Sequence, residues 1–363
     1  MGKKAVKQYF NAVILTITVI LFIFTFVGLY GGDVKPEGHT LRALSTLALP
    51  VIIAMTFLTL IYWSIRRSWF ALIPILPLVF SVRYLGTIFQ FGGKPDNITP
   101  VLTVGSYNVR CFNRDATGIV SMDMLSAMQK EGVDVLCMQE FDNTASGDQR
   151  SVIERYKDAY PYSAVGKDMA ILSRRPIKGS KEIPFEYSNN GAIWADIQID
   201  ESHTVRVFNV HMETTGINST LHQATKNGEI DGNSTPVDIA TNQNVRGSLL
   251  DSYVMNSVIR GGQAAIISNE CHSSPHPTIL CGDFNDVPYS YTYNTLLGNM
   301  TDGFREGGHG YGSTYHGMKG LLRIDYIFHP ESMQSLDYYT LSLENSDHDP
   351  VISKLTYLSS SSK

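Results

Sequence analysis

Three long apolar segments dominate the first quarter of the chain. No charged residue lies between Lys7 and Asp33, and residues 10–30 are almost wholly apolar. A second uncharged segment covers residues 43–65, and a third covers residues 68–90 with two prolines and one arginine inside it. A helix needs about 20 apolar residues to cross the hydrocarbon core of a bilayer. The pattern therefore predicts a membrane anchor over residues 1–92, with two transmembrane helices and a third candidate.

The cations beside these segments predict how the anchor is oriented. Three lysines precede the first segment, and Arg66 and Arg67 separate the second from the third. Both clusters are expected in the cytoplasm, because cytoplasmic loops are enriched in lysine and arginine. Three crossings then place the rest of the chain on the extracytoplasmic side, whereas a third segment that turns back would leave it in the cytoplasm. A cleaved signal peptide fits poorly, since two more apolar segments follow the first.

The pattern changes after residue 92. Glycines and prolines predict a linker over residues 93–100. Short apolar runs follow, several of which stop at a polar residue, and such runs predict β-strands. The predicted strands cover residues 101–107, 133–138, 169–172, 205–210, 278–282 and 324–328.

Helical periodicity appears between these runs. Apolar residues recur at helical spacing over residues 119–130 and again over residues 237–267, where Gly261 and Gly262 are candidates for a break. The mixture predicts stacked sheets with outer helices over residues 101–357. Residues 214–236 are rich in Asn, Thr, Gly and Ser and predict a long polar loop, either a lid that selects substrate or an ordinary surface loop.

Charge divides the chain at the same place. Residues 1–96 carry a net charge of +6, and the remainder carries −11. An acidic second part argues against tight nonspecific binding to duplex DNA. The four cysteines fit no zinc-binding spacing. Cys137 and Cys281 lie in apolar runs and are expected to be buried, and a disulfide between Cys111 and Cys271 is left open.

Polar residues at the ends of the predicted strands are the candidates for chemistry. Asp283 and Asn285 stand on alternate positions, so their side chains point to one side of an extended chain. His348 is flanked by two acids, which favour its charged form and shift its pKa. Asn108 and Glu140 follow two early strands and offer the oxygen ligands that Mg²⁺ prefers. Each motif alone is also compatible with an ordinary turn or a solvated surface cluster.

The order of these motifs resembles the endonuclease/exonuclease/phosphatase superfamily, which includes pancreatic-type deoxyribonuclease, abasic-site endonucleases, inositol-phosphate phosphatases and neutral sphingomyelinases. The resemblance covers roughly residues 101–354. It rests on Tyr107-Asn108-Val109, Gln139-Glu140, Asn209-Val210-His211, Gly282-Asp283-Phe284-Asn285, Arg323-Ile324-Asp325-Tyr326-Ile327-Phe328 and Ser346-Asp347-His348-Asp349-Pro350. It implies a four-layer α/β sandwich of two packed mixed β-sheets with outer helices, here preceded by transmembrane helices.

The resemblance also implies a metal site and a base. Glu140, with Asn108 beside it, would hold Mg²⁺ (with Mn²⁺ as the alternative) against a phosphate oxygen, and Asp347 would be a further metal contact or a supporting residue. His348 would be the general base or electrostatic partner of the attacking water. Asp325 would orient His348 by accepting a hydrogen bond.

Three further residues complete the implied set. Asp283 and Asn285 would position the nucleophile and stabilise the charge that develops on phosphorus. His211 would bind a phosphate oxygen or assist the leaving group. The chemistry implied is direct in-line attack of water, without a covalent enzyme intermediate.

The motifs leave the substrate open. The anchor and the acidic second part favour a phosphodiesterase for a lipid or a small molecule, with membrane lipid as the partner of the N-terminal helices and no protein partner predicted. A membrane-anchored nuclease is the second interpretation, although no dense basic cluster accompanies the motifs. A catalytically inactive, anchored binding module is the third, and it would require a missing catalytic group where every expected position is filled.

Overall fold

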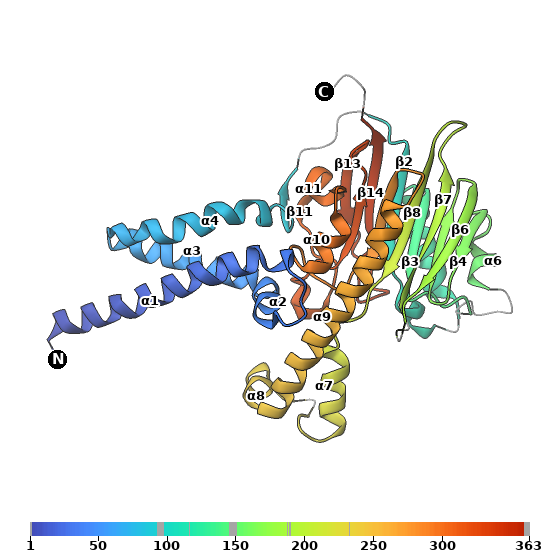
Figure 1. Cartoon of the computed structure of the whole chain (residues 1–363). Helices are drawn as coiled ribbons and strands as arrows, with labels where there is room; N and C mark the ends of the chain where they lie inside the picture. Colours follow the sequence, from blue (N-terminus) through green and yellow to red (C-terminus); the bar gives the residue numbers. More distant parts are fainter. Residues whose placement is uncertain are drawn as a thin grey trace.

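The computed structural model describes residues 2–92, 98–115, 117–144, 151–186, 188, 190–231 and 233–358. Two six-stranded mixed β-sheets pack face to face in the part after residue 100 (Figure 1). The first sheet has the order β13 (Met333–Thr340), β14 (Val351–Tyr357), β2 (Leu102–Asn108), β3 (Val135–Gln139), β5 (Met169–Ser173) and β4 (Tyr162–Val165). The second has the order β10 (Thr301–Asp302), β12 (Asp325–His329), β9 (Thr278–Asp283), β8 (Thr204–His211), β7 (Gly191–Gln198) and β6 (Ile177–Pro184).

Helices cover the outer face of each sheet. The first sheet packs against α5 (Ile119–Lys130) and α6 (Val152–Tyr156), and the second packs against α9 (Gln243–His272) and α10 (Tyr291–Leu297). The central strand β3 is buried along its whole length because both faces of its sheet are covered. These layers form the four-layer α/β sandwich that the sequence predicts.

The predicted strands correspond to β2, β3, β5, β8, β9 and β12, and the predicted helix over residues 119–130 is α5. Cys137 and Cys281 are buried between the sheets, and all four cysteines are free. The remaining short elements of this part are η3 (Arg110–Arg114), α11 (Gly303–Gly307), β11 (His309–Tyr311) and α12 (Gly317–Gly320).

Two expectations about the segment after His211 need correction. The expected polar loop over residues 214–236 contains α7 (Ile217–Lys226), and α8 (Pro236–Thr241) forms with it an arm that projects beside the first turns of α9 (Figure 1). Helix α9 runs through Gly261 and Gly262 without a break. A Cβ atom on Gly261 would lie 3.2 Å from the ring of Tyr291, so this glycine allows a close approach of α10 to the helix.

Three helices of the N-terminal part form a bundle that projects from the sandwich (Figure 1). The elements are α1 (Lys3–Leu29), η1 (Gly31–Asp33), α2 (Thr40–Leu47), α3 (Leu49–Ile65), η2 (Trp69–Ala71), α4 (Leu72–Leu85) and β1 (Phe89–Phe91), and the bundle consists of α1, α3 and α4. One helix near the N-terminus, α1, is long and apolar enough to cross a membrane. The second expected span is divided between α2 and α3, which meet at an angle of 69°, and the third corresponds to the shorter apolar stretch Trp69–Leu85.

The bundle has apolar residues outside and polar residues inside. Side chains such as Val51 and Ile65 are 66% and 76% exposed, respectively. In the interior, the hydroxyls of Thr25 and Thr56 lie 3.3 Å apart, and Trp63 Nε1 donates to Thr18 Oγ1 at 2.9 Å. The interior also contains apolar side chains such as Leu49 and Ile53, but a bundle that folds in water does not expose so many apolar residues on its outside.

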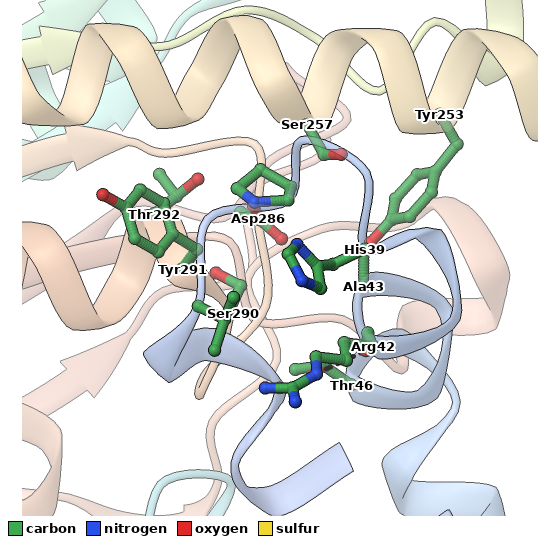
Figure 2. Close-up of a pocket in the computed structure, with 13 residues that line it drawn as sticks. His39, Arg42, Ala43, Thr46, Tyr253, Ser257, Asp286, Ser290, Tyr291 and Thr292 are labelled. Atoms are coloured by element: carbon green, nitrogen blue, oxygen red, sulfur yellow. Dashed lines mark hydrogen bonds between the residues drawn. The ribbon is translucent and has the colours of Figure 1, made fainter. Parts of the chain in front are cut away.

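The bundle is attached to the sandwich at several points. Gly32 packs on the backbone of Tyr289 and Ser290, where a Cβ atom would lie 2.1 Å from the Tyr289 carbonyl oxygen. Figure 2 shows α2 and the turn before it facing α9 and the segment after Asp286. Strand β1 pairs with β11 in a small antiparallel sheet. These contacts precede the expected linker at residues 93–100, of which residues 93–97 lie outside the described part of the chain.

A buried ion pair adds a further attachment. Arg323 donates to both carboxylate oxygens of Asp302, at 2.7 and 2.6 Å, and also to the carbonyl oxygen of Thr87 at 3.0 Å. Thr87 lies two residues after the end of α4, and Arg323 lies two residues before the start of β12. The end of the bundle is therefore fastened to the strand that carries Asp325.

An amide network joins the two sheets beneath the strand ends. Asn209 accepts a hydrogen bond from Gln139 Nε2 at 2.6 Å and donates to the carbonyl oxygens of Met138 and Ala170. All of these groups are buried. We expect Asn209→Ala to lower the free energy of unfolding by about 3 kcal/mol, because it leaves buried polar groups without partners. Thermal unfolding checks this, with exposed Asn227→Ala as control; an equal midpoint for both variants would contradict it.

Candidate active site

Strand register brings the predicted residues to one edge of the sandwich. In the first sheet β2 and β3 are parallel, and Asn108 pairs with Gln139, the residue before Glu140. In the second sheet Asp283 pairs with His211 on one side and with Asp325 on the other. Each sheet thus places polar residues at the end of its central parallel pair, as expected from the strand ends in the sequence.

His348 lies between two buried carboxylates. Its Nδ1 atom is 3.0 Å from Asp325 Oδ2, and its Nε2 atom is 3.7 Å from Asp283 Oδ2. All three residues are at most 5% exposed. Burial alone would lower the pKa of His348, but the charges of Asp325 and Asp283 outweigh it and raise the pKa to about 10. In the protein without cation or substrate, His348 is therefore an imidazolium at neutral pH.

Two neighbours hold His348 in place. The ring of Tyr315 lies over the imidazole with centroids 4.9 Å apart. The backbone N–H of His348 donates to Ser346 Oγ, and that hydroxyl donates to the carbonyl oxygen of Asn108 at 2.8 Å. The loop that carries His348 is thereby connected to the end of β2.

Asn108 holds two acids together. Its Nδ2 atom donates to Glu140 Oε1 at 3.0 Å and to Asp283 Oδ2 at 3.1 Å. Its Oδ1 atom accepts from the backbone N–H of Arg110. Glu140 adopts a positive φ of 49°, a backbone conformation that is uncommon outside glycine and is often found at functional sites. One amide thus aligns carboxylates from both sheets.

Asn285 also adopts a positive φ, of 51°. Its backbone N–H donates to Asp283 Oδ1 at 2.8 Å, and its side-chain amide donates to the carbonyl oxygen of Met212. Burial raises the pKa of Asp283, although the charge of His348 opposes that rise. Asp283 therefore has the imidazolium on one side and two amide donors on the other.

His211 is paired with an acid that the sequence interpretation missed. Its Nδ1 atom lies 3.1 Å from Asp168 Oδ2, while its buried Nε2 atom has no hydrogen-bond partner. Burial would lower the pKa of His211, but Asp168 and Asp283 outweigh it and raise the pKa. The Nε2 atom is therefore available for a hydrogen bond with a bound ligand. Asp168 precedes β5, which is antiparallel to β3, so the start of β5 meets the end of β3 at the site.

Asp347 faces solvent and an arginine, although its charge also contributes to the raised pKa of His348. Its carboxylate is 36% exposed and lies 3.7 Å from Arg110 Nε. The structure brings together the side chains of Asn108, Glu140, Asp283, Asp325 and His348, with His211 and Asn285 at their margin.

The chemistry of these donors fits a hard divalent cation. Among the described residues, the ligand atoms of Asp283, Asp325 and His348 lie within 4.8 Å of one another. The amide that Asp283 and Glu140 share is neutral and offsets none of their charge. The negative charge of the carboxylates therefore exceeds the positive charge of His348. Oxygen ligands with an excess of negative charge are what Mg²⁺ and similar ions bind.

An open cavity of about 630 Å³ lies beside this cluster. Glu140, Asp142 and Asp168 line it, together with His211 and Lys167. Glu140 and His211 therefore face both the buried cluster and the cavity, which gives a substrate access to them.

We expect Asp168→Asn to lower kcat/KM about tenfold, because the charged partner that orients His211 is lost while the side chain keeps its shape. Steady-state kinetics checks this against Asp158→Asn, an exposed acid outside the site. Equal activity of the two variants would show that the pairing of Asp168 with His211 has no part in the reaction.

Comparison with known proteins agrees with this geometry. Residues 105–348 match the Endonuclease/Exonuclease/phosphatase family, and because this is more than half of the chain, the protein belongs to that family. It is a hydrolase that acts on phosphoester bonds, in a family of divalent-metal-dependent enzymes. Residues 11–88 match a domain of unknown function (DUF8431). No curated protein matches the chain.

Solved structures share the fold at low sequence identity. A functionally unknown conserved protein from Enterococcus faecalis is 16% identical with a TM-score of 0.50, over 71% of this chain and 100% of its own. Sphingomyelinase C from Streptomyces griseocarneus is 17% identical with a TM-score of 0.46, over 69% and 98%. D. rerio TDP2 complexed with a single-strand DNA product is 14% identical with a TM-score of 0.48, over 70% and 98%.

Proposed function

We propose that this protein is a membrane-anchored, Mg²⁺-dependent phosphodiesterase, with Mn²⁺ as an alternative ion, that acts on a lipid or a small phosphodiester. The observation that carries this proposal is the position of His348, between Asp325 and Asp283 and beside Glu140 and Asn108. A base oriented by one acid faces a site of oxygen ligands, as hydrolysis of an anionic ester by water requires.

Glu140 and Asp283 are the carboxylates that would hold the ion, with Asn108 aligning them. A bound divalent ion supplies positive charge that offsets the charge of the phosphodiester and of the transition state. Asp347 would take part from outside this pair, since its carboxylate lies near Arg110 and solvent.

His348 is the proposed base. Asp325 accepts from Nδ1, so Nε2 is the nitrogen left to take a proton from water. This role needs the neutral imidazole, which is favoured once the charge of Asp283 is compensated in the loaded enzyme. Asn285 would help to position the water, and His211 Nε2 would donate to a phosphate oxygen where charge develops.

The charge of the cavity favours a small or lipid substrate over a nucleic acid. Glu140, Asp142 and Asp168 supply three carboxylates, against Lys167 and the imidazole of His211, whose pKa is raised by the neighbouring acids. A nucleic acid is bound mainly through basic side chains on its phosphates. Among the described residues, those that line this cavity do not offer such a surface.

The bundle supports the proposed anchoring. Its outside is apolar and its inside carries hydroxyl pairs, as expected for helices that pack in lipid. Helices α1 and α4 run toward the sandwich and α3 runs away from it (Figure 1). The lysines at the start of α1 and the arginines after α3 therefore lie at the end remote from the sandwich. Cytoplasmic placement of these cations would put the catalytic part on the extracytoplasmic side.

We expect the cysteine introduced by Lys157→Cys to react with a membrane-impermeant maleimide in intact cells. The cysteine introduced by Arg67→Cys is expected to react only after lysis. Both are made in a background with Cys111→Ser and Cys271→Ser, because these native cysteines are partly exposed. If the cysteine from Lys157→Cys reacts only after lysis as well, the catalytic part is in the cytoplasm and the third apolar segment turns back.

The activity itself is tested with the full chain in detergent or nanodiscs, with and without Mg²⁺. The substrates are sphingomyelin, glycerophospholipids, phosphorylated inositols and plasmid DNA. We expect metal-dependent cleavage of a lipid or inositol substrate. Cleavage of DNA alone would support the nuclease instead, and a folded, metal-binding protein inactive on all four would support the binding module.

A further inference from the structure

A second large cavity lies between the bundle and the sandwich. It has a volume of about 630 Å³. Leu29, Val79 and Phe80 line it from the ends of α1 and α4, and Tyr289, Asn294 and Leu297 line it from the sandwich. Active-site residues do not contribute to this lining, so the cavity is separate from the site proposed above.

Two arginines from different parts of the fold meet in this cavity. Arg83 lies in the last turn of α4, and Arg305 lies in α11. Both are exposed, and neither forms an ion pair with an acid among the described residues. Burial raises the pKa of Tyr289, and the charges of Arg305 and Arg83 oppose that rise, so both cations act on the same phenol.

The acids nearby already have partners. Asp33, which also lines the cavity, accepts a hydrogen bond from Asn294 at 3.3 Å. In an adjoining cavity that Arg83 and Arg305 share, Asp302 is paired with Arg323, and Glu306 lies 3.0 Å from His329 Nε2. The cavity therefore keeps a net positive charge of one, with its two cations uncompensated by direct pairing.

One wall of the cavity continues onto the apolar outside of the bundle. Val79 and Phe80 are 61% and 47% exposed, and the neighbouring Leu76 and Val82 are exposed too. The helices end here, at the depth where lipid headgroups would surround a spanning bundle. Apolar surface and cationic groups are thus adjacent at this level.

We propose that this cavity binds an anionic glycerophospholipid, with its phosphate between Arg83 and Arg305 and an acyl chain along Val79 and Phe80. Arginine binds phosphate oxygens through paired N–H groups, and the apolar wall gives a lipid an advantage over a free phosphate. The net positive charge favours an anionic headgroup over a zwitterionic one. This inference rests on the proposed membrane anchoring but not on the proposed hydrolysis.

The test uses the full chain in nanodiscs of phosphatidylcholine with or without phosphatidylglycerol, and native mass spectrometry after release counts the lipids that remain bound. The double variant Arg83→Gln/Arg305→Gln is compared with Lys157→Gln/Lys178→Gln, which removes the same charge from exposed positions on the sandwich. We expect retained phosphatidylglycerol to fall about tenfold or more in the first variant and to stay unchanged in the control.

Each outcome decides the proposal. Equal retention in both variants, or equal retention of phosphatidylcholine and phosphatidylglycerol by the unaltered protein, would overturn it. Displacement of the lipid by millimolar glycerol phosphate as readily as by short-chain phosphatidylglycerol would show that the cavity binds phosphate without using its apolar wall, and would also overturn it. Vesicle flotation tests the anchoring separately, and metal-dependent hydrolysis of a soluble phosphodiester, measured on the same samples, reports on the proposed function.

Discussion

Replacing His348 with alanine is expected to lower kcat/KM by a factor of roughly 10² to 10⁴, the range usual for the loss of a positioned acid or base. The imidazole is held by Asp325 at 3.0 Å and by the ring of Tyr315, and its Nε2 atom faces the cluster. Its removal takes away the proposed proton acceptor of the attacking water. Steady-state kinetics with saturating Mg²⁺ measures the loss.

The matched control is His272→Ala, an exposed histidine at the end of α9. It should retain full activity. Asp325→Asn adds a graded test, since it keeps the shape of the side chain that orients His348 but removes its charge; we expect an intermediate loss. Full activity in His348→Ala would exclude this residue as the base.

Glu140→Gln is expected to abolish most activity at ordinary Mg²⁺ concentrations, by a factor on the order of 10³. The substitution keeps the volume of the side chain and removes the charge that a cation would meet. Raising the Mg²⁺ concentration should restore part of the lost rate, because the substitution weakens the affinity for the ion. Activity measured as a function of Mg²⁺ or Mn²⁺ concentration separates a loss of metal affinity from a direct catalytic effect.

Asp142→Asn provides the control for Glu140→Gln. Asp142 lines the same cavity two residues further on, and its carboxylate accepts hydrogen bonds from Thr144. The Asp142→Asn substitution should change the dependence of activity on metal concentration only slightly. An identical shift in both variants would mean that the general negative charge of the cavity, and not Glu140 itself, attracts the ion.

The sequence predicts the centre of each sheet better than its edges. Strands β2, β3, β8 and β9 are apolar runs that stop at a polar residue, because both faces are covered and their ends form the site. Strand β6 has mostly exposed or half-buried residues and a proline at its end, so its composition resembles that of a loop. The edge strands β4, β6, β10 and β13 were not predicted, and neither were β7 and β14 beside them.

The same reasoning explains which site residues were found. Motifs at the ends of parallel strands were recognisable because the apolar run points to the polar residue after it. Asp168 stands before its strand, and only the antiparallel pairing of β5 with β3 shows that this start lies at the site. Helix α7 was missed because four of its ten residues are Asn, Ser or Thr, and its burial is limited largely to Ala224.

The hydrogen bond from Arg323 to Thr87 and the β1–β11 pair attach the catalytic part directly to the end of the bundle, in addition to the chain connection over residues 93–100. With the bundle in a bilayer, the opening of the active site would keep a constant distance from the lipid surface and a constant orientation to it. Such an enzyme would work within one leaflet without leaving it between turnovers. Its rate would then follow the mole fraction of substrate in the membrane, and not the bulk concentration.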